Sequence, residues 1–378
     1  MAEVIAPVST AQPATIPDHD KKYVYFHSGS EATYREVLDD TPSSSSSSFT
    51  SIPTVDLAGL DDESSPTERQ RIAREIRDAC RECGFFYVKN HGVPDEVVRQ
   101  TFALLRRFFA LDTAAKMEAH VQKNPAIRGY EPMLETNLDP RTKGDIKEAF
   151  TMGDCYLEPE QDYTGKTGQP GPPPHVTRSQ NIWPPQAPLL VRVFALGFGL
   201  DEDAFDPMFR FPITGMRPLH YPPTPVSSTG EEHVGLGAHA DFSFLQDDVP
   251  ALEVLNQAGH WVDAPPAPGT FVCNVGQYLE RQSNGRYPAT VHRVRNKTGR
   301  ERYSLPFFLT PGPEVELEVL SCCYDDDDDG KENPRKYDAI NVGDLYIRRV
   351  LPARRKHPTS IKNRDVPEEE WSYNMLLS

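Results

Sequence analysis

The chain has 378 residues, 36 of them proline, and a formal net charge of −16 at pH 7. An acidic chain is repelled by nucleic acids and by anionic lipid surfaces, so we expect neither as a partner. No apolar run approaches the length of a membrane span, and the first twenty residues lack the cationic and apolar regions of a secretory signal. These features predict a cytoplasmic protein with no membrane association.

Residues 1–50 are expected to form a mostly disordered N-terminal arm. The arm ends in six consecutive serines, Ser43–Ser48, which cannot pack a core. Within it, the apolar stretch 22–27, KYVYFH, is the one place where short-range order is expected. We therefore expect removal of residues 1–48 to leave the core fold intact.

Regular structure is predicted to begin with a short strand at 51–57, followed by a helix at 65–83. Ser65 is a candidate N-cap, Pro66 occupies the first helical position, Glu68 completes a capping box and Gly84 ends the helix. A strand and turn at 85–94 then lead into a second amphipathic helix. Its predicted inward-facing residues are Val98, Phe102, Leu105 and Phe109.

Six cysteines are too few for a disulfide scaffold in a chain of this length, which suits a reducing compartment. Cys80 and Cys83 form a C-x-x-C pattern that is compatible with redox or zinc chemistry. They also lie on the same predicted helical face as Ile72 and Ile76, so we interpret them as core residues.

Residues 155–188 are rich in Gly and Pro and predict a long surface connection, and the helix that follows should end near Gly199. From about 212 to 312 the chain consists of short Val-, Leu-, Phe- and Thr-rich segments separated by Gly, Pro and Asn. This cadence is typical of a β-sandwich or jelly roll. The acidic run Asp325–Asp329 predicts a solvated loop, with a calcium loop as the alternative, and 335–357 predicts a helix with a basic end.

Three residues in this β-rich region have the chemistry of a metal site. His239 and Asp241 are two positions apart, so in a strand they point to the same face, and His292 lies in another β-prone segment. Two histidines and one carboxylate are the ligand set of a non-haem Fe(II) site that leaves coordination positions open. Arg302 and Ser304 share a face in the same way and offer a guanidinium and a hydroxyl to a carboxylate.

From about residue 50 to 355 the chain resembles the isopenicillin N synthase-like branch of 2-oxoglutarate/Fe(II)-dependent oxygenases. The resemblance rests on IPTVDL (52–57), ACRECGFFYVKNHGVP (79–94), RGY (128–130), HYPP (220–223), the H-x-D at 239–241, QYLERQSNGRYPATVHRV (277–294) and the R-x-S at 302–304. The family implies an α+β fold, a double-stranded β-helix (jelly roll) core with flanking N-terminal and C-terminal helices. It also implies an N-terminal helix and strand region at 51–185, the jelly-roll domain at 186–357 and a C-terminal tail at 358–378.

The same resemblance implies that His239, Asp241 and His292 bind iron, and that Arg302 and Ser304 hold the distal carboxylate of 2-oxoglutarate with help from Tyr221. The cofactors would be Fe(II), 2-oxoglutarate as co-substrate and O2, with ascorbate as an assay reductant. The expected activity is oxidation of a small-molecule metabolite, by hydroxylation, desaturation or cyclisation, in specialised metabolism. We expect a monomer with a small-molecule substrate as its partner.

Two segments are shorter than the family pattern, one directly after Asp241 and one before residue 194. Two alternatives therefore stay open: an isopenicillin N synthase-type oxidase that needs no 2-oxoglutarate, and a shortened non-catalytic jelly-roll binding protein. His91 and His220 are interpreted as structural, with a place in the substrate pocket as the alternative for His220. Tyr221 has simple packing before the two prolines as its alternative role.

Overall fold

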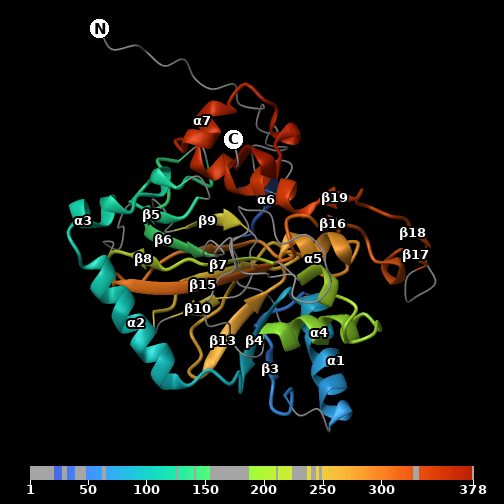
Figure 1. Ribbon diagram of the computed structural model, residues 1–378. Helices are drawn as coiled ribbons and strands as arrows, with labels where there is room; N and C mark the ends of the chain where they lie inside the picture. Colours follow the sequence, from blue (N-terminus) through green and yellow to red (C-terminus); the bar gives the residue numbers. More distant parts are fainter. Residues whose placement is uncertain are drawn as a thin grey trace, which may run out of the picture.

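The computed structural model describes residues 21–27, 32–38, 48–61, 65–124, 127–139, 142–153, 187–209, 212–223, 236–239, 244–246, 249–326 and 332–376. Two β-sheets enclose an apolar interior, and helices cover the outside of the larger sheet (Figure 1). The predicted jelly-roll core is therefore confirmed. No helix of the described ranges is long and apolar enough to cross a bilayer.

The larger sheet follows the order β3-β4-β13-β10-β15-β7-β6-β5, and β8 pairs with both β15 and β6. Its strands are β3 (Thr54–Asp56), β4 (Phe85–Lys89), β5 (Gly129–Glu131), β6 (Glu148–Gly153), β7 (Ile213–Met216), β8 (Leu219–Tyr221), β10 (Phe244–Gln246), β13 (Thr270–Asn274) and β15 (Arg302–Thr310). Strands from both sides of the predicted boundary at 185/186 share this sheet, so the two predicted regions are joined in one layer.

The smaller sheet has the order β12-β11-β14-β9. Its strands are β9 (Leu236–His239), β11 (Leu252–Leu255), β12 (Trp261–Asp263) and β14 (His292–Val294). Side chains from both sheets meet in one buried cluster, including Phe85 and Val272 from the larger sheet and Val254 and Val294 from the smaller one. This cluster lines the space between the sheets, which we call the interior.

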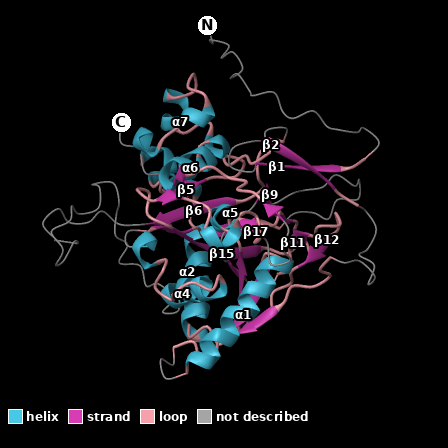
Figure 2. Cartoon of the chain, turned by 90° about the vertical axis from the view of Figure 1, so that its right-hand side faces the viewer, coloured by secondary structure: helices cyan, strands magenta, loops and turns pink. Residues whose placement is uncertain are grey.

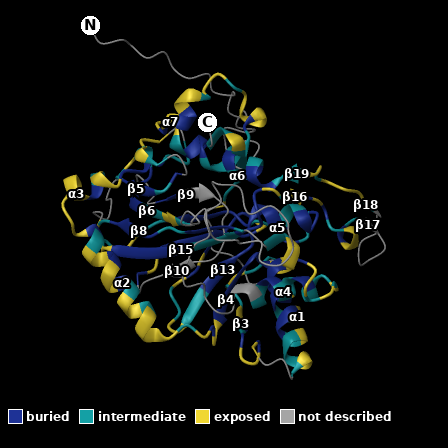
Figure 3. Cartoon of the chain, in the orientation of Figure 1, coloured by how far each residue is buried: buried dark blue, intermediate teal, exposed yellow. Residues whose placement is uncertain are grey.

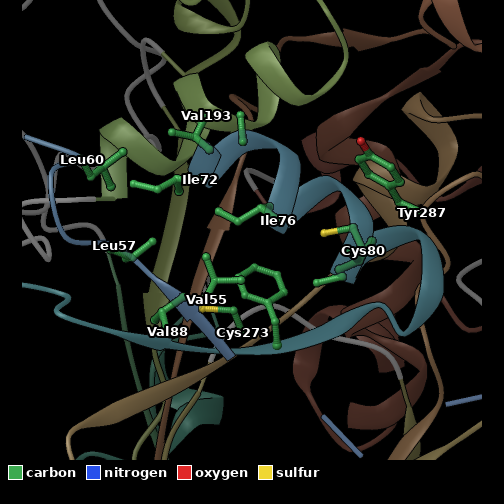
Figure 4. Close-up of a cluster of buried hydrophobic side chains, with 14 of the residues drawn as sticks. Val55, Leu57, Leu60, Ile72, Ile76, Cys80, Val88, Val193, Cys273 and Tyr287 are labelled. Atoms are coloured by element: carbon green, nitrogen blue, oxygen red, sulfur yellow. The ribbon is translucent and has the colours of Figure 1, made fainter. Parts of the chain in front are cut away.

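Helices α1 (Pro66–Glu82) and α4 (Ala187–Gly197) cover one half of the outer face of the larger sheet (Figure 4). Ile72, Ile76 and Cys80 from α1 pack on Val88 of β4 and Cys273 of β13. Both residues of the C-x-x-C pattern are buried and are free thiols, which confirms the core interpretation. The predicted capping box is wrong: the Ser65 side chain caps no backbone amide, and Glu68 instead pairs with Arg71 at 2.8 Å.

Helix α2 (Asp95–Phe109) covers the other half of that face, and its outward side is largely exposed (Figure 3). Three of its four predicted inward residues, Phe102, Leu105 and Phe109, are buried in a cluster with Tyr130 and Tyr303 of the sheet, and Val98 is partly buried against it. Side chains alternate between the two faces along a strand. Because Tyr303 faces α2, its neighbours Arg302 and Ser304 face the interior. This alternation defines the wall of the candidate site.

Two strands from within the arm predicted to be mostly disordered, β1 (Tyr23–His27) and β2 (Ala32–Glu36), pair as an antiparallel hairpin. The hairpin lies over the smaller sheet (Figure 2), where Val24 and Phe26 pack on Leu255 and Val291. The short ordered stretch expected at 22–27 is thus β1. The arm is ordered here because its alternating apolar residues find an uncovered patch on the jelly roll.

The C-terminal residues form short helices that pack together at one end of the larger sheet (Figure 1). They are α6 (Val342–Val350), the 3-10 turn η4 (Pro352–Arg354), α7 (Pro358–Lys362), η5 (Glu368–Glu370) and η6 (Tyr373–Leu376). The predicted helix at 335–357 corresponds to α6, which is shorter than expected and has Arg348 and Arg349 in its last turn, while Arg354 from the predicted basic end lies in η4. Arg354 of η4 reaches the end of β5, where it pairs with Glu131.

The remaining elements are short connections. They are α3 (Thr113–Glu118), η1 (Val121–Lys123), η2 (Asp206–Phe209), α5 (Gln277–Gln282), β16 (Glu316–Leu317), η3 (Ser321–Cys323), β17 (Asp325–Asp326), β18 (Glu332–Asn333) and β19 (Ile340–Asn341). The predicted connection at 155–188 lies almost entirely outside the described residues, as does most of the acidic run.

Candidate active site

The two histidines predicted to bind iron lie on neighbouring strands of the smaller sheet. The antiparallel register of β14 and β9 sets His292 directly opposite His239. The side chain of His239 and the whole of Asp241 lie outside the described residues. In the part of the chain that is described, no three metal-ligating side chains gather. The backbone therefore brings two of the three predicted ligand positions together, and the third stays a prediction.

His292 itself has the environment of a metal ligand. Its side chain is completely buried, and Phe85 packs against it edge-on with ring centroids 5.1 Å apart. The Nδ1 atom lies 3.1 Å from the carbonyl oxygen of Thr290, which can only accept a hydrogen bond. Nδ1 therefore carries the proton, and in the neutral ring Nε2 keeps its lone pair. Metal-binding histidines are typically oriented in this way, so His292 fits an iron site.

Arg302, Ser304 and Tyr221 form the facing wall. Arg302 pairs with Tyr221 across β15 and β8, and all three residues are at least 98% buried. The Arg302 guanidinium carbon lies 4.9 Å from the centre of the Tyr221 ring, and its Nε donates to the Val249 carbonyl at 3.3 Å. The structure therefore brings all three predicted co-substrate residues to one face.

The Tyr221 hydroxyl is a buried polar group with no hydrogen-bond partner within the described ranges. Burial raises the pKa of Tyr221 to about 12, although the charge of Arg302 opposes the shift. The phenol is therefore neutral and able to donate. A guanidinium and two hydroxyls on one buried face suit a carboxylate, because all three groups can donate hydrogen bonds to its oxygens.

His220 and His91 are structural, as interpreted from the sequence. His220 faces α2, stacked on Tyr303 with ring centroids 4.8 Å apart, and its two nitrogens lie 2.7 Å from Glu148 and 2.9 Å from Glu301. The alternative that His220 lines the pocket is wrong, because it is on the opposite face of β8 from Tyr221. His91 stacks on Phe271 and accepts a hydrogen bond from the Val93 amide at 3.2 Å.

Sequence reasoning missed a group of buried charges that continues the same wall, centred on Glu131 and Lys147. The available signal was the alternation in residues 147–151, KEAFT, where Lys147, Ala149 and Thr151 share one face of a strand. Glu148 and Phe150 alternate with them and face α2. A lysine on an interior face is rare, because burying an ammonium group is costly.

Two family models match the chain. The model described as the N-terminal domain of a non-haem dioxygenase in morphine synthesis matches residues 52–186, and that of the 2OG-Fe(II) oxygenase superfamily matches residues 212–311. The chain belongs to the 2OG-Fe(II) oxygenase superfamily. As members of this family use Fe(II), 2-oxoglutarate and O2, the predicted cofactor set is confirmed at the level of the family.

Curated relatives support the same assignment. The chain is 32% identical to the 2-oxoglutarate-Fe(II) type oxidoreductase ppzC of Metarhizium majus over 333 residues, covering 79% of this chain and 86% of that protein. It is 33% identical to homoarginine-6-hydroxylase 2-ODD-C23 of Glycine max over 307 residues, covering 72% and 89%.

Among solved structures, a full-length Neurospora crassa protein in complex with alpha-KG superposes with a TM-score of 0.64 at 26% identity. The match covers 80% of this chain and 96% of that one. The structure of JOX2 in complex with 2OG, Fe and JA gives a TM-score of 0.60 at 25% identity, covering 81% and 85%. Strands β1 and β2 precede both family matches.

Proposed function

We propose that the chain oxidises a small-molecule metabolite by Fe(II)- and 2-oxoglutarate-dependent chemistry, with His239, Asp241 and His292 as the iron ligands. Fe(II), when bound with 2-oxoglutarate, supplies the O2 activation that protein side chains lack. The observation that carries the proposal is that His239 and His292 lie directly opposite each other on neighbouring strands. In addition, the His292 ring is buried and its Nδ1 donates to the Thr290 carbonyl.

Arg302, Ser304 and Tyr221 would hold the distal carboxylate of 2-oxoglutarate. The Arg302 guanidinium donates to the Val249 carbonyl and lies over the Tyr221 ring, and these two contacts fix its orientation before the ligand binds. Pre-orientation of this kind lowers the entropic cost of binding. The surrounding apolar side chains exclude water from the site, which strengthens each charged contact.

The substrate class is inferred from relatives. Those relatives include proteins named for homoarginine hydroxylation and a structure that holds thymine. We accordingly propose hydroxylation, desaturation or cyclisation of a small metabolite, in specialised metabolism, by a cytoplasmic monomer. The five described cysteines are free thiols, which suits a reducing compartment.

The decisive test measures succinate released from 2-oxoglutarate in air, with Fe(II) and ascorbate, against a panel of small metabolites that includes homoarginine and thymine. We expect release that depends on iron and that at least one panel member stimulates. His292→Ala is the inactive control. Oxygen uptake without succinate would instead indicate an oxidase that needs no 2-oxoglutarate. Metal binding with neither product would indicate a non-catalytic binding protein.

A further inference from the structure

The interior wall of the larger sheet extends beyond the co-substrate residues into a group of buried charges. In register, Glu131 of β5 lies opposite Ala149, Ala149 opposite Leu219, and Leu219 opposite Ser304. Residues directly opposite on antiparallel strands share a face of the sheet. Glu131 is therefore on the same wall as Ser304. Lys147 directly precedes β6, and its Nζ donates to Thr136 Oγ1, the hydroxyl that itself donates to Glu131, so Lys147 reaches the same buried cluster.

Glu131 is fully buried and completely paired. Its two oxygens accept from Arg217 at 2.9 Å, Arg354 at 3.0 Å, Thr136 at 2.5 Å and Thr151 at 3.0 Å. Burial alone would raise the pKa of Glu131, but the charges of Arg217 and Arg354 hold it well below its usual range. Glu131 is thus a fixed anion that pairs with both arginines, and each arginine keeps one buried Nε–H without a hydrogen-bond partner among the described residues.

Lys147 is different, because its charge is buried without an ionic partner. The side chain is 1% exposed, and its Nζ donates a single hydrogen bond, 2.7 Å long, to Thr136 Oγ1. Among the described residues no carboxylate oxygen lies within ion-pair distance of this Nζ. An ammonium group has three donors, so two remain for a ligand. Leaving buried donors and a buried charge unmatched is costly, and this points to a partner absent from the chain itself.

The charged residues around Lys147 also act on the co-substrate site. Arg217 and Asp145 act electrostatically on Lys147 and also on Tyr221, which is paired with Arg302. In register, Tyr221 lies opposite Arg302, and Glu148, the residue after Lys147, lies opposite His220, the residue before Tyr221. Lys147 is therefore placed to meet a molecule bound beside 2-oxoglutarate.

We propose that Lys147 anchors a carboxylate of the primary substrate, so that the enzyme selects acids over their neutral analogues. This rests on the proposed function. When Lys147 is protonated, three cations and two anions gather here (Lys147, Arg217 and Arg354 with Glu131 and Asp145), which leaves one positive charge. A monocarboxylate neutralises that charge and accepts both free donors. A neutral carbonyl or amide accepts the donors but leaves the charge in place.

Carboxylate binding should be coupled to proton uptake. Burial lowers the pKa of Lys147 to about 7, with Arg217 and Arg354 acting in the same direction and Glu131 and Asp145 opposing. Thr136 is the remaining polar neighbour. At higher pH the amine is neutral and attracts an anion weakly, so the affinity for a carboxylate should fall as pH rises through 7. A bound carboxylate favours the ammonium and raises the pKa of Lys147.

The test uses acetate as a carboxylate probe and acetamide as its neutral counterpart, because both are small enough to enter whatever the size of the substrate. Thermal unfolding is followed with Mn(II) and saturating 2-oxoglutarate present, so that the Arg302 site is filled. We expect acetate to raise the melting temperature of the wild type more than acetamide does. The difference should shrink at a pH above 7, disappear in Lys147→Met and persist in Lys147→Arg. Lys89→Met, a change at an exposed lysine, is the control and should respond like the wild type.

An equal response to acetate and acetamide, or an acetate preference that survives in Lys147→Met, would overturn the assignment. If Lys147→Met fails to fold, the pH dependence of the acetate response is compared between Lys147→Arg and the wild type, and this comparison tests the assignment. Arginine keeps its charge, so the pH dependence of the acetate response should vanish in that variant. Iron-dependent succinate release by the wild type is measured in parallel. Absence of succinate release would contradict the proposed function. Succinate release without a preference for acetate would contradict only the role of Lys147.

Discussion

His292 combines complete burial with a ring nitrogen that is fixed by the Thr290 carbonyl, and these two properties decide how its other nitrogen acts. A buried imidazolium would need a nearby anion, whereas a neutral ring with Nε2 unprotonated can ligate a metal. For single residues, the site is therefore a set of side chains whose protonation and orientation are set before ligands arrive.

Replacing His292 by Ala should weaken Fe(II) binding by an order of magnitude or more, and the same holds for His239 and Asp241, because a three-ligand site has no spare ligand. Anaerobic titration calorimetry measures the affinity. His91→Ala is the matched control, since His91 is a buried histidine that stacks on Phe271 away from the proposed ligands. Unchanged iron affinity in one of the three variants would remove that residue from the triad.

Arg302→Lys should impair the enzyme nearly as much as Arg302→Ala, since an ammonium cannot make the two-pronged contact that a guanidinium makes with a carboxylate. The expected signature is a higher KM for 2-oxoglutarate with unchanged iron affinity, measured by steady-state succinate release. Arg293→Lys is the control, because Arg293 pairs with Glu253 at 2.7 Å and covers the Trp261 ring instead. Full activity in Arg302→Lys would contradict the bidentate assignment.

Ion pairs and small apolar patches connect the elements around the jelly roll. Glu148 of β6 is the clearest case, because it accepts from Lys116 of α3 at 2.7 Å, from Tyr130 of β5 at 2.5 Å and from His220 of β8 at 2.7 Å. Burial alone would raise the pKa of Glu148, but hydrogen bonds from His220, Lys116 and Tyr130 lower it to about 2.

A lowered carboxyl pKa makes stability depend on pH in acid. The contribution of Glu148 is fully present above its ordinary pKa of 4.5 and is lost as pH falls from there to about 2. Glu148→Gln should therefore cost on the order of 3 kcal/mol of unfolding free energy at pH 7 and show a weaker acid dependence than the wild type. Urea unfolding across this range measures both effects. Glu301→Gln, at a half-exposed partner of His220, serves as the control, and wild-type stability of Glu148→Gln would contradict the prediction.

The N-terminal hairpin bears on the expectation from the sequence that removal of residues 1–48 leaves the fold and iron binding intact. Partly buried Val24, Phe26 and Val37 pack on the jelly roll, and the Leu38 amide donates to the Gly259 carbonyl at 2.8 Å. Each such side chain contributes about 1 kcal/mol before the cost of ordering.

Deleting residues 1–38 should therefore lower the melting temperature by several degrees, measured by circular dichroism. Val24→Asp should reproduce part of the loss, because it places a charge against Leu255 and Val291. Lys21→Ala, at an exposed ion pair with Glu36, should have little effect. A truncated protein that melts with the full-length chain would show that the hairpin contributes nothing to stability.

Across the molecule as a whole, the two sheets are held together through an interior that also contains the ligand sites. Ligands that bind only the folded state should stabilise it, by about 2.7 kcal/mol at a concentration one hundred times the dissociation constant. Mn(II), a redox-stable substitute for Fe(II), should raise the melting temperature, 2-oxoglutarate should raise it further, and a chelator should reverse both shifts. In Arg302→Ala, Mn(II) should still raise the melting temperature, but 2-oxoglutarate should no longer raise it further. Absence of any shift with both ligands would contradict an interior metal and co-substrate site.

The roles of the R-x-S and H-x-D motifs were predicted from the family resemblance. Patterns within the sequence were enough to predict the β-rich cadence of 212–312 and the helices α1 and α2 with their buried faces. These follow from short-range periodicity and turn residues, which act over a few neighbouring positions. The docking of the hairpin on Leu255, the outward orientation of His220 and the place of Lys147 in the buried charge cluster became known only from the folded chain. Each of these depends on strand register and on packing between residues far apart in the chain, and periodicity within one segment carries no information about its partner.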